Sequence, residues 1–504
     1  MDKKLLIQEQ LINRQSRREV CRESLFLFGV YYFSHYMTHD FAYFHTIMTS
    51  RLGFRGFYKY LIFIMFRESA KTAWAKIFLI WCICYKKKHY IKYICYDVNK
   101  SKGHLFDIAV ELQSNRDLIR DFGQLFFEGE FESEEGKSEK KSIGEFVTSN
   151  GIKVQAGSTG ISTRGDVYGP YRPDLYVLDD FETDKTKRSK KRTEEVINYI
   201  DELIGGVSVD ANILFLCNRL SKKGSVAYIE KKAIDNPNWK KIEVRLISRK
   251  SGKIAWPAKF VRTDEEAWRI NSSREDPKTH VFSIEAKIRD LGTARFNQEY
   301  NNIPIEDGEM RYRQEWIDAN YYSELPRMEL MNIVMAVDPN AGQSKLADFM
   351  GILVMGEDRN TKLRYVLAVY AEKLTVDKQL DKLKTIYNLW KPAQIGIEVV
   401  RSQRALYELA KSSNHFRLKK LDPEGRDKID RSAFVEPLVE NGTIKFNPLH
   451  KAFHDELLAF PNGDHDDMVD AFIYANQMFD KFSAHRLSTT KSPGVTAGLM
   501  NKNF

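Results

Sequence analysis

The sequence has few cysteines and no long apolar run, and each absence excludes a class of protein. Five cysteines among 504 residues form no Cys-x-x-Cys pair and no Cys/His ligand set, so we expect buried free thiols rather than a disulfide framework or a zinc site. The apolar run at 77–85 is too short to span a bilayer and is followed at once by three lysines. Residues 1–18 are polar and charged, unlike a signal peptide. We therefore expect a soluble intracellular protein.

The overall composition is that of a globular protein with more than one domain. Hydrophobic residues make up 43% of the chain and charged residues 29%, which are ordinary values. A chain of 504 residues is too long for one core, so two domains with appendages are expected. The net charge of +9 is compatible with a nucleic-acid partner, but enzymes of neutral substrates are often as basic, so it demonstrates none.

The stretch 60–80 organises the rest of the chain. An apolar run at 61–65 has the length and residue types of a buried strand, and 73–79 is typical of a helix. A strand, a tight loop ending in Lys71-Thr72 and a helix together predict a phosphate-binding loop. Backbone N–H groups and the helix N-terminus would cradle phosphates, Lys71 would neutralise them, and the Thr72 hydroxyl would reach Mg²⁺. The loop contains Arg67, Glu68, Ser69, Ala70, Lys71 and Thr72.

This loop lacks the glycines of the usual G-x-x-x-x-G-K-[ST] motif. Met65 and Ala70 stand in their places. Alanine still allows fairly close backbone approach, but it does not freely adopt the positive φ that glycine does. On this stretch alone, an ordinary strand-to-helix junction with a solvated lysine remains an alternative.

A second element of an ATPase site follows at 175–180, where an apolar strand ends in two carboxylates. In ATPases with a phosphate-binding loop, a strand-end Asp holds Mg²⁺ and another residue positions the attacking water. Asp179 would hold Mg²⁺, and Asp180 or Glu182 would polarise the water. A strand that ends in a solvated Asp-Asp turn is the alternative. We expect a helix at 101–118, between the two motifs, and another at 186–204, after the second motif. Strands alternating with helices in this way imply a parallel α/β sheet.

Two further positions are candidates around this site. Arg164 lies in a polar Gly/Ser/Thr loop shortly before the strand, where an arginine could stabilise γ-phosphate charge, although a surface arginine is the alternative. Asn218 and Arg219 end the next strand, at 212–217, on the sheet edge where a γ-phosphate sensor would sit.

Acidic residues end apolar runs in the second half of the chain. Asp338 ends a strand at 333–338, Glu398 ends one at 395–398, and Asp466, Asp467 and Asp470 open a helix. Asp467 and Asp470 share a helix face, but Asp466 and Asp470 are also a turn apart, so the pair that faces inward stays open. Converging carboxylates must be protonated or bind cations. Oxygen ligands suit Mg²⁺ or Mn²⁺, and two such ions can clamp a phosphodiester, which predicts a two-metal nuclease.

For each of these acids taken alone, a strand-end residue or a helix N-cap is the favoured explanation. Asp348, in a polar loop, is a hairpin residue or a further ligand, and we favour the hairpin. Arg401, Arg404, Lys419 and Lys420 could track DNA phosphates or form a solvated charged face.

Taken together, these motifs resemble the large terminase subunit of tailed bacteriophages. That family's deviant Walker A loop, Arg-x-x-x-[Gly/Ala]-Lys-[Ser/Thr], is matched by Arg67, Ala70, Lys71 and Thr72. Its Walker B motif is similar to 175–180, its coupling motif to 217–219, and its link between motor and nuclease to 296–304. The D-x-x-D-A pattern at 467–471 also resembles the last motif of Holliday-junction resolvases.

The resemblance implies an α/β fold: a P-loop (ASCE-type) ATPase domain with a parallel sheet, followed by a ribonuclease H-like nuclease domain. We accordingly expect an N-terminal helical, aromatic subdomain at 1–50, the ATPase domain at 51–310, a linker at 311–328, the nuclease domain at 329–480 and a flexible tail at 481–504.

The resemblance also implies a function. ATP hydrolysis would drive double-stranded DNA into a procapsid, and the nuclease would cut concatemeric DNA. Arg67 and Lys71 would bind the β- and γ-phosphates of ATP with Mg²⁺, and two Mg²⁺ or Mn²⁺ ions would serve the nuclease. Expected partners are DNA, a portal protein, a small terminase subunit and further copies of the chain, in a pentameric ring on the procapsid in the host cytoplasm or as a monomer in solution.

Two other classes of protein remain as alternatives. One is a ribonuclease H-fold recombinase or transposase-like nuclease whose N-terminal half only binds DNA. The other is a non-catalytic assembly protein.

Overall fold

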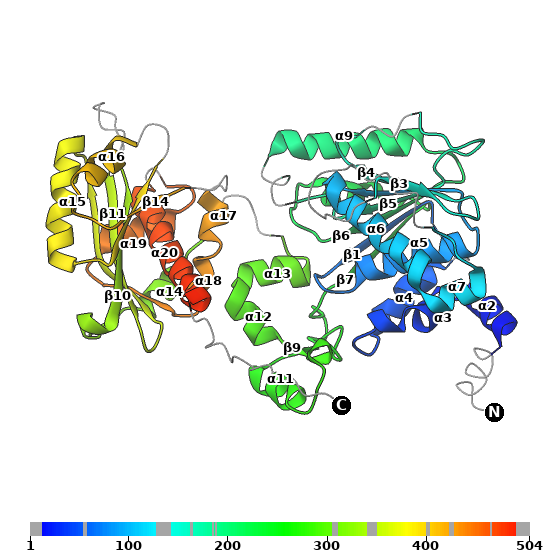
Figure 1. Cartoon of the computed structure of the whole chain (residues 1–504), viewed down its shortest axis with the longest axis horizontal. Helices are drawn as coiled ribbons and strands as arrows, with labels where there is room; N and C mark the ends of the chain where they lie inside the picture. Colours follow the sequence, from blue (N-terminus) through cyan, green and yellow to red (C-terminus); the bar gives the residue numbers. More distant parts are fainter. Residues whose placement is uncertain are drawn as a thin grey trace, which may run out of the picture. The chain divides into compact units, whose positions relative to one another are not determined.

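The chain forms two compact units, shown in the computed structural model of Figure 1. The first contains Met1–Ile288 and Thr293–Asp307, and the second contains Arg289–Gly292 and Gly308–Phe504. We call them the N-terminal unit and the C-terminal unit. Within the described residues, no helix is long and apolar enough to cross a membrane. The structure describes residues 13–53, 58–127, 143–161, 165–183, 186, 189–304, 311–339, 350–399, 404–422, 428–463 and 466–489.

Short aromatic helices begin the N-terminal unit. They are α2 (Arg14–Glu23), α3 (Leu25–Tyr32), η1 (Ser34–Tyr36) and α4 (Tyr43–Leu52). Asn13 and Ser24 accept backbone N–H bonds at the starts of α2 and α3, which sets where each helix begins. α3 packs so closely on α5 (Lys71–Cys84) that a Cβ at Gly29 would lie 2.5 Å from the ring of Trp74. Glycine at position 29 therefore permits this approach of the two helices. The indole of Trp81 donates to the carbonyl of Cys21. All five cysteines are buried and free, as the sequence predicts.

A seven-stranded sheet forms the core of the N-terminal unit. Its order is β3-β4-β2-β5-β6-β1-β7, and every neighbouring pair is parallel except β3 and β4. β1 is apolar along its whole length because both faces of the sheet are covered. β6 lies between β1 and β5, so the carboxyl ends of all three strands meet at one edge, where ligands bind in open α/β sheets. The strands are β1 (Tyr60–Met65), β2 (Tyr90–Cys95), β3 (Glu145–Val147), β4 (Lys153–Ser158), β5 (Leu175–Asp179), β6 (Asn212–Cys217) and β7 (Trp239–Val244).

Helices alternate with these strands, and a small helical region follows them. The segment 101–118, predicted as one helix, is part of two, because Asn115 ends α6 and caps α7 through its side chain. Side chains of β1, β5, β6 and α9 form one buried apolar cluster. The elements are α6 (Val98–Ser114), α7 (Arg116–Phe122), α9 (Lys190–Gly206), α10 (Ser225–Lys232), β8 (Phe260–Val261), α11 (Asp264–Asn271), η2 (Pro277–Thr279), β9 (Phe282–Ser283), α12 (Ile284–Leu291) and α13 (Thr293–Asn301).

The C-terminal unit has a mixed six-stranded sheet in the order β14-β13-β10-β11-β12-β15. β10, β11 and β12 are successively antiparallel, and β13 and β14 continue parallel to β10. The elements are α14 (Gln314–Asp318), η3 (Met328–Leu330), β10 (Met331–Asp338), β11 (Met350–Asp358), β12 (Arg364–Glu372), α15 (Val376–Trp390), β13 (Gln394–Glu398), α16 (Arg404–Ser412), β14 (Leu418–Leu421), α17 (Lys428–Ser432), α18 (Glu436–Glu440), β15 (Ile444–Lys445), α19 (Lys451–Ala459) and α20 (Asp467–Thr489).

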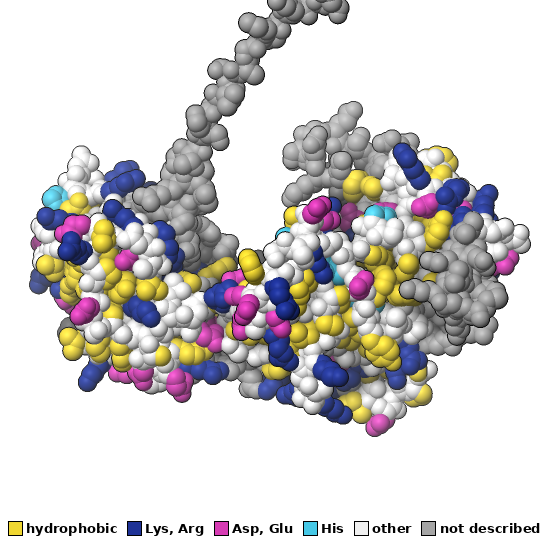
Figure 2. Space-filling view, turned by 90° about the horizontal axis from the view of Figure 1, so that it is seen from below, with side chains coloured by type: hydrophobic (Ala, Val, Ile, Leu, Met, Phe, Trp, Pro, Cys, Tyr) yellow, Lys and Arg dark blue, Asp and Glu magenta, His cyan; other side chains and the backbone are white. Residues whose placement is uncertain are grey.

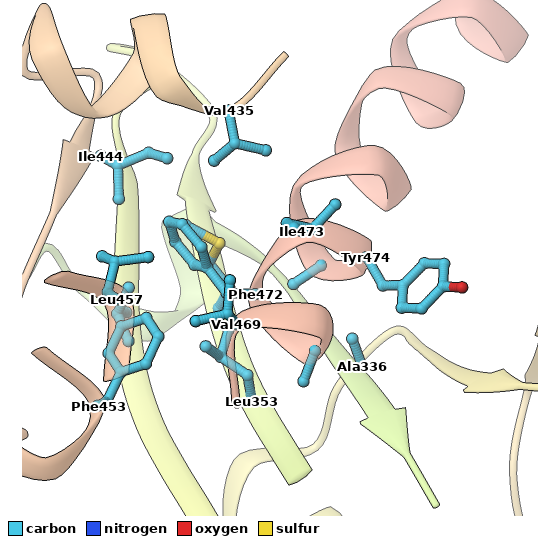
Figure 3. Packing of buried hydrophobic residues seen from close by; sticks show 14 of the residues in the cluster. Ala336, Leu353, Val435, Ile444, Phe453, Leu457, Val469, Phe472, Ile473 and Tyr474 are labelled. Atoms are coloured by element: carbon cyan, nitrogen blue, oxygen red, sulfur yellow. The ribbon is translucent and has the colours of Figure 1, made fainter. Parts of the chain in front are cut away.

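Two apolar clusters cover this second sheet. One contains side chains of β10 together with α15 and α16, and the other gathers around α20. In the second cluster, Phe472 projects from α20 toward Val469 and Leu353, whereas Tyr474 projects from another side of the helix (Figure 3). The first turns of α20 are therefore buried all round, and Tyr474, itself a member of this cluster, also carries a hydroxyl that reaches the acidic site described below.

The ends of the C-terminal unit differ from a simple linker and tail. Tyr312 and Ile317, in the segment 311–328 that the sequence indicates as a linker, are buried in the cluster around α20. Three apolar residues in a polar segment, Tyr312, Trp316 and Ile317, are enough to pack it onto the core. α20 continues to Thr489, inside the segment expected to be a tail.

On the face shown in Figure 2, basic and acidic side chains are interspersed with hydrophobic ones, rather than gathered in one patch.

Candidate active sites

The loop after β1 has the shape of a phosphate-binding loop although its glycines are absent. Glu68 and Ala70 both adopt left-handed backbone conformations, with φ of 66° and 65°. Ala70 is the N-cap of α5, so Lys71 and Thr72 begin the helix, and its N-terminal N–H groups face the loop. Alanine thus takes the conformation that the usual glycine would supply, at a cost of about 1 kcal/mol.

This strain gives a first prediction. Ala70→Gly should stabilise the N-terminal unit by about 1 kcal/mol, because glycine reaches φ near 65° without the steric penalty of a Cβ. Thermal unfolding of the full chain would measure the change. Ala73→Gly, inside α5 and away from the strained turn, is the matched control and should destabilise by about the same amount. A destabilising Ala70→Gly would show that the left-handed turn is not strained.

Three strand ends bring the predicted ATPase residues into contact. The Thr72 hydroxyl donates to Oδ2 of Asp179 at 2.8 Å, and the Tyr93 hydroxyl donates to the same oxygen at 2.7 Å. Oδ1 of Asp179 has no hydrogen-bonding partner within the described residues. Lys71 donates to Oδ1 of Asn218 at 2.6 Å and lies 3.7 Å from Oδ1 of Asp180. The loop, the strand-end acids and Asn218 therefore form one cluster.

The two neighbouring carboxylates differ in their electrostatics. Burial, with the nearby charge of Asp180, raises the pKa of Asp179 above its ordinary value. Burial acts in the same direction on Asp180, but Lys71 and Lys100 outweigh it and hold the pKa of Asp180 below its ordinary value. Lys100 donates to Oδ2 of Asp180 at 2.6 Å. Asp180 is therefore ionised at neutral pH, between two cations.

A cleft of about 330 Å³ lies over this cluster. Glu182 reaches the same cleft, and its Oε1 accepts from the backbone N–H and the hydroxyl of Ser225 at the start of α10. Both candidate water-activating acids therefore line one space. The cleft is lined by Arg67, Lys71, Tyr96, Asp97, Lys100, Asp180, Glu182, Thr183, Cys217, Asn218, Leu220 and Glu299.

Glu68 contacts the helical region at 259–302. Its Oε1 accepts from Lys287 at 2.8 Å and from the Tyr300 hydroxyl at 2.7 Å, and its Oε2 lies 3.7 Å from Lys259. Burial works against ionisation, but these partners hold the pKa of Glu68 below its ordinary value. The Glu68 side chain thus fastens the loop to α12 and α13. Lys287 and Tyr300 lie more than two hundred residues along the chain from Glu68, so the local motif gave no signal of them.

The end of α13 also binds the loop and the candidate coupling residues. The carbonyl of Glu299 accepts from the backbone N–H of Arg67 at 2.8 Å and from the Asn218 amide at 3.3 Å. Arg219 is paired with Glu230 and Glu243 and donates to the carbonyl of Asn302. Arg219 is thus held in an ion-pair network, while Asn218 contacts Lys71. Ser69 is buried in the loop, and its carbonyl lies 3.2 Å from Nε2 of His45. Arg164 lies outside the described residues.

In the C-terminal unit, Asp338 and Glu398 end the adjacent strands β10 and β13, and both are buried. Burial and the nearby Glu398, Asp470 and Asp467 together raise the pKa of Asp338 well above its ordinary value. The Tyr474 hydroxyl donates to Oε1 of Glu398 at 2.5 Å. The strand ends and the start of α20 thus bring together the acids that the sequence singled out.

The other acids of this group are held by cations on α17. Lys428 lies 2.5 Å from Oδ1 of Asp466 and 2.6 Å from Oδ2 of Asp470, and Arg431 lies 3.3 Å from Oδ1 of Asp470. Burial raises the pKa of Asp470 to about 6 despite these cations. Asp470 and Asp466 outweigh burial and raise the pKa of Lys428 to about 12. No local sequence pattern marks Lys428 or Arg431 as part of this group.

Close packing and a cap fix the start of α20. A Cβ at Gly351 of β11 would lie 2.3 Å from the carbonyl oxygen of Asp467, so only glycine allows this approach. Glu456 on α19 accepts from the N–H groups of Met468 and Val469, and burial raises its pKa. These contacts determine where Asp467 lies.

The donor set suits a hard divalent cation, because it consists of carboxylate oxygens alone. Within the described residues, however, no group of three His, Cys, Asp or Glu side chains is arranged to hold a metal ion. Asp338 lies near Glu398, Asp470 and Asp467, while Lys428 contacts Asp466 and Asp470. Asp348 lies outside the described residues.

Comparison with known proteins bears on the C-terminal unit. Residues 335–479 match the family model described as the terminase RNaseH-like domain. No curated protein matches the chain. Similar solved structures include the large terminase of a thermophilic bacteriophage, at 12% identity over 84% of this chain and 94% of that one, with a TM-score of 0.46. The HK97 bacteriophage large terminase is 12% identical over 86% of this chain and 94% of that chain, with a TM-score of 0.33. The human cytomegalovirus terminase nuclease domain is 16% identical over 36% of this chain and 98% of that chain, with a TM-score of 0.28.

The family match covers β10 to β15 and most of α20, the elements that carry Asp338, Glu398 and the acids of α20. The expected α/β fold, with a parallel-rich sheet in the N-terminal unit and a ribonuclease H-like domain after it, is confirmed. Residues 335–479 are thus similar to the terminase RNaseH-like domain, which agrees with the resemblance of the sequence to large terminase subunits.

Proposed function

We propose that the chain is a viral large terminase subunit that translocates double-stranded DNA with energy from ATP and cuts concatemeric DNA with a metal-dependent endonuclease. The observation that carries the proposal is the contact of Lys71 with Asn218 and of Thr72 with Asp179 at one sheet edge, in a chain that also has a terminase RNaseH-like domain. We assign the ATPase to residues 51–310 and the nuclease to 329–480.

In the proposed ATPase site, Lys71 and Arg67 bind the β- and γ-phosphates from the same cleft. Thr72 and Asp179 fit a Mg²⁺ ion, because the Thr72 hydroxyl lies beside the Asp179 carboxylate and both groups offer oxygen ligands. Oδ1 of Asp179 has no hydrogen-bonding partner within the described residues. When bound, the ion would neutralise charge that develops on the phosphates. Asn218, which contacts Lys71, would respond to the γ-phosphate together with Arg219. Arg164 remains the proposed arginine finger.

Asp180 is the acid that we propose to activate the water. Its pKa is held low, so it is an ionised hydrogen-bond acceptor at neutral pH, and it lies close to Lys71. Asp180→Asn should lower the rate of ATP hydrolysis on the order of 10²- to 10⁴-fold and leave nucleotide binding in place. Glu182→Gln still offers an acceptor to Ser225 and should retain most of the hydrolysis. The opposite pattern in steady-state assays would assign the role to Glu182.

In the proposed nuclease site, Asp338, Glu398 and Asp467, with Asp466 or Asp470, would bind Mg²⁺ or Mn²⁺. Such ions supply an activated water and neutralise the phosphodiester in metal-dependent cleavage. Asp338 is buried near three other acids, so a divalent cation would relieve the repulsion that raises its pKa. The Tyr474 hydroxyl would orient Glu398.

The proposed partners follow from this function. They are double-stranded DNA, a portal protein, a small terminase subunit and further copies of the chain in a ring on the procapsid, in the host cytoplasm. Arg404, Lys419 and Lys420 are candidate contacts to DNA phosphates, and Arg401 lies outside the described residues.

A paired assay on the full chain tests the proposal. ATP hydrolysis should depend on Lys71, and Mg²⁺- or Mn²⁺-dependent plasmid cleavage should depend on Asp338, each independently of the other. Cleavage without ATP hydrolysis would favour a recombinase instead, and the absence of both activities would favour a non-catalytic assembly protein.

A further inference from the structure

We infer that Lys428 is a resident cation of the acidic site in the C-terminal unit, and that a divalent metal ion binds there only by displacing it. The inference rests on the proposed nuclease function. It concerns the affinity for metal and goes beyond the assignment of ligands.

The contacts of Lys428 are those of a cation within a ligand group. Its ammonium lies 2.5 Å from Asp466, which immediately precedes α20, and 2.6 Å from Asp470 in the first turn of α20. A divalent ion needs the same oxygen lone pairs. Within the described residues, no three acids are arranged around a common ion position. The ammonium of Lys428 thus lies where a metal ion would need these oxygens.

Asp470 is engaged by cations through both of its oxygens. Lys428 contacts Oδ2 and Arg431 contacts Oδ1. These two cations are not equally free to leave. The Arg431 side chain is 6% exposed and lies over the ring of Tyr474, with its Cζ 4.6 Å from the ring centroid. The Lys428 side chain is 34% exposed, so it can turn toward solvent. We therefore expect a metal ion to displace Lys428 and leave Arg431 in place.

The size of the effect follows from the charges. A unit positive charge this close to the ligand oxygens repels a second cation and competes with it for the same lone pairs. Removing the charge should therefore tighten metal binding by about tenfold or more. The wild-type site would fill only at higher metal concentrations than its carboxylates alone would require.

Binding of Mn²⁺ to the full chain, followed by the electron paramagnetic resonance of the free ion, tests this without any activity assay. Only the component that Asp338→Asn removes is counted, which separates this site from the ATPase site. Lys428→Met should bind Mn²⁺ about tenfold more tightly than wild type, whereas Lys428→Arg, which keeps the charge, should not. Lys384→Met is the matched control, because Lys384 pairs with Asp381 on the exposed face of α15 in the same unit.

An unchanged or weaker affinity in Lys428→Met would overturn the inference and leave the proposed nuclease standing. If neither wild type nor Lys428→Met shows binding that Asp338→Asn removes, the metal-dependent nuclease itself fails, and the inference fails with it. Thermal unfolding without metal verifies that each variant is folded. If Lys428→Met does not fold, Lys428→Gln is measured in its place, with the same expected tightening and the same contrary result.

Discussion

Lys71→Ala should lower steady-state ATP hydrolysis by about 10²- to 10³-fold or more. The ammonium of Lys71 lies between Asn218 and Asp180 in the cleft, where a bound phosphate would meet it. Its loss removes the charge that neutralises the phosphates, and it leaves Asp180 with Lys100 as the nearest cation. A colorimetric phosphate-release assay on the full chain measures the effect.

The matched control for this variant is Lys76→Ala. Lys76 lies on the same helix and pairs with Asp107 at 2.9 Å, away from the residues that line the cleft. It should retain hydrolysis. If Lys71→Ala hydrolyses ATP as fast as wild type, the motor proposal is wrong and the recombinase alternative gains. Plasmid cleavage by Lys71→Ala should continue at the wild-type rate, since the acids of the C-terminal unit are unchanged.

Asp338→Asn should abolish Mg²⁺- or Mn²⁺-dependent plasmid nicking while ATP hydrolysis stays intact. Asp338 is buried beside Glu398, and its ionised form is the one a metal ion would bind. An amide has no charge to offer the ion, so a loss of about 10²-fold or more is expected. Gel analysis of supercoiled plasmid measures the nicking.

The stability of this variant separates lost chemistry from lost folding. A carboxyl whose pKa is raised in the folded state stabilises the fold at low pH, and this contribution is lost as the pH rises through its folded pKa. At neutral pH without metal, Asp338→Asn should therefore melt at or above the wild-type temperature. Asp381→Asn, exposed on α15, is the control for both assays. Undiminished nicking by Asp338→Asn would exclude the proposed metal site.

The local pattern of apolar residues was sufficient to predict the strands that end at the candidate site residues. The apolar runs before Lys71, Asp179 and Asn218 form neighbouring parallel strands, so their ends meet as expected. The runs before Asp338 and Glu398 are also adjacent strands. Parallel strands with both faces covered have continuous apolar sequences, and this pattern is read without tertiary information.

Contacts between distant segments could not be predicted in this way. Glu68 was grouped with the nucleotide ligands by its place in the loop, yet its carboxylate contacts Lys287, 219 residues away. Lys428 is one of many lysines in the sequence, and only the fold brings it to Asp466 and Asp470. The left-handed turn at Ala70 runs against the preference of alanine and is imposed by the loop. Position along the chain carries no signal for the two contacts, whereas Ala70 stands where the usual motif has glycine.

The end of α13 has a mechanical consequence. The carbonyl of Glu299 holds both the backbone of Arg67 and the amide of Asn218, and Tyr300 holds Glu68. A rearrangement of the loop after β1 must therefore either break these bonds or pull α13 with it. In the proposed motor, a movement of this loop would accordingly reach the segment of chain that follows α13.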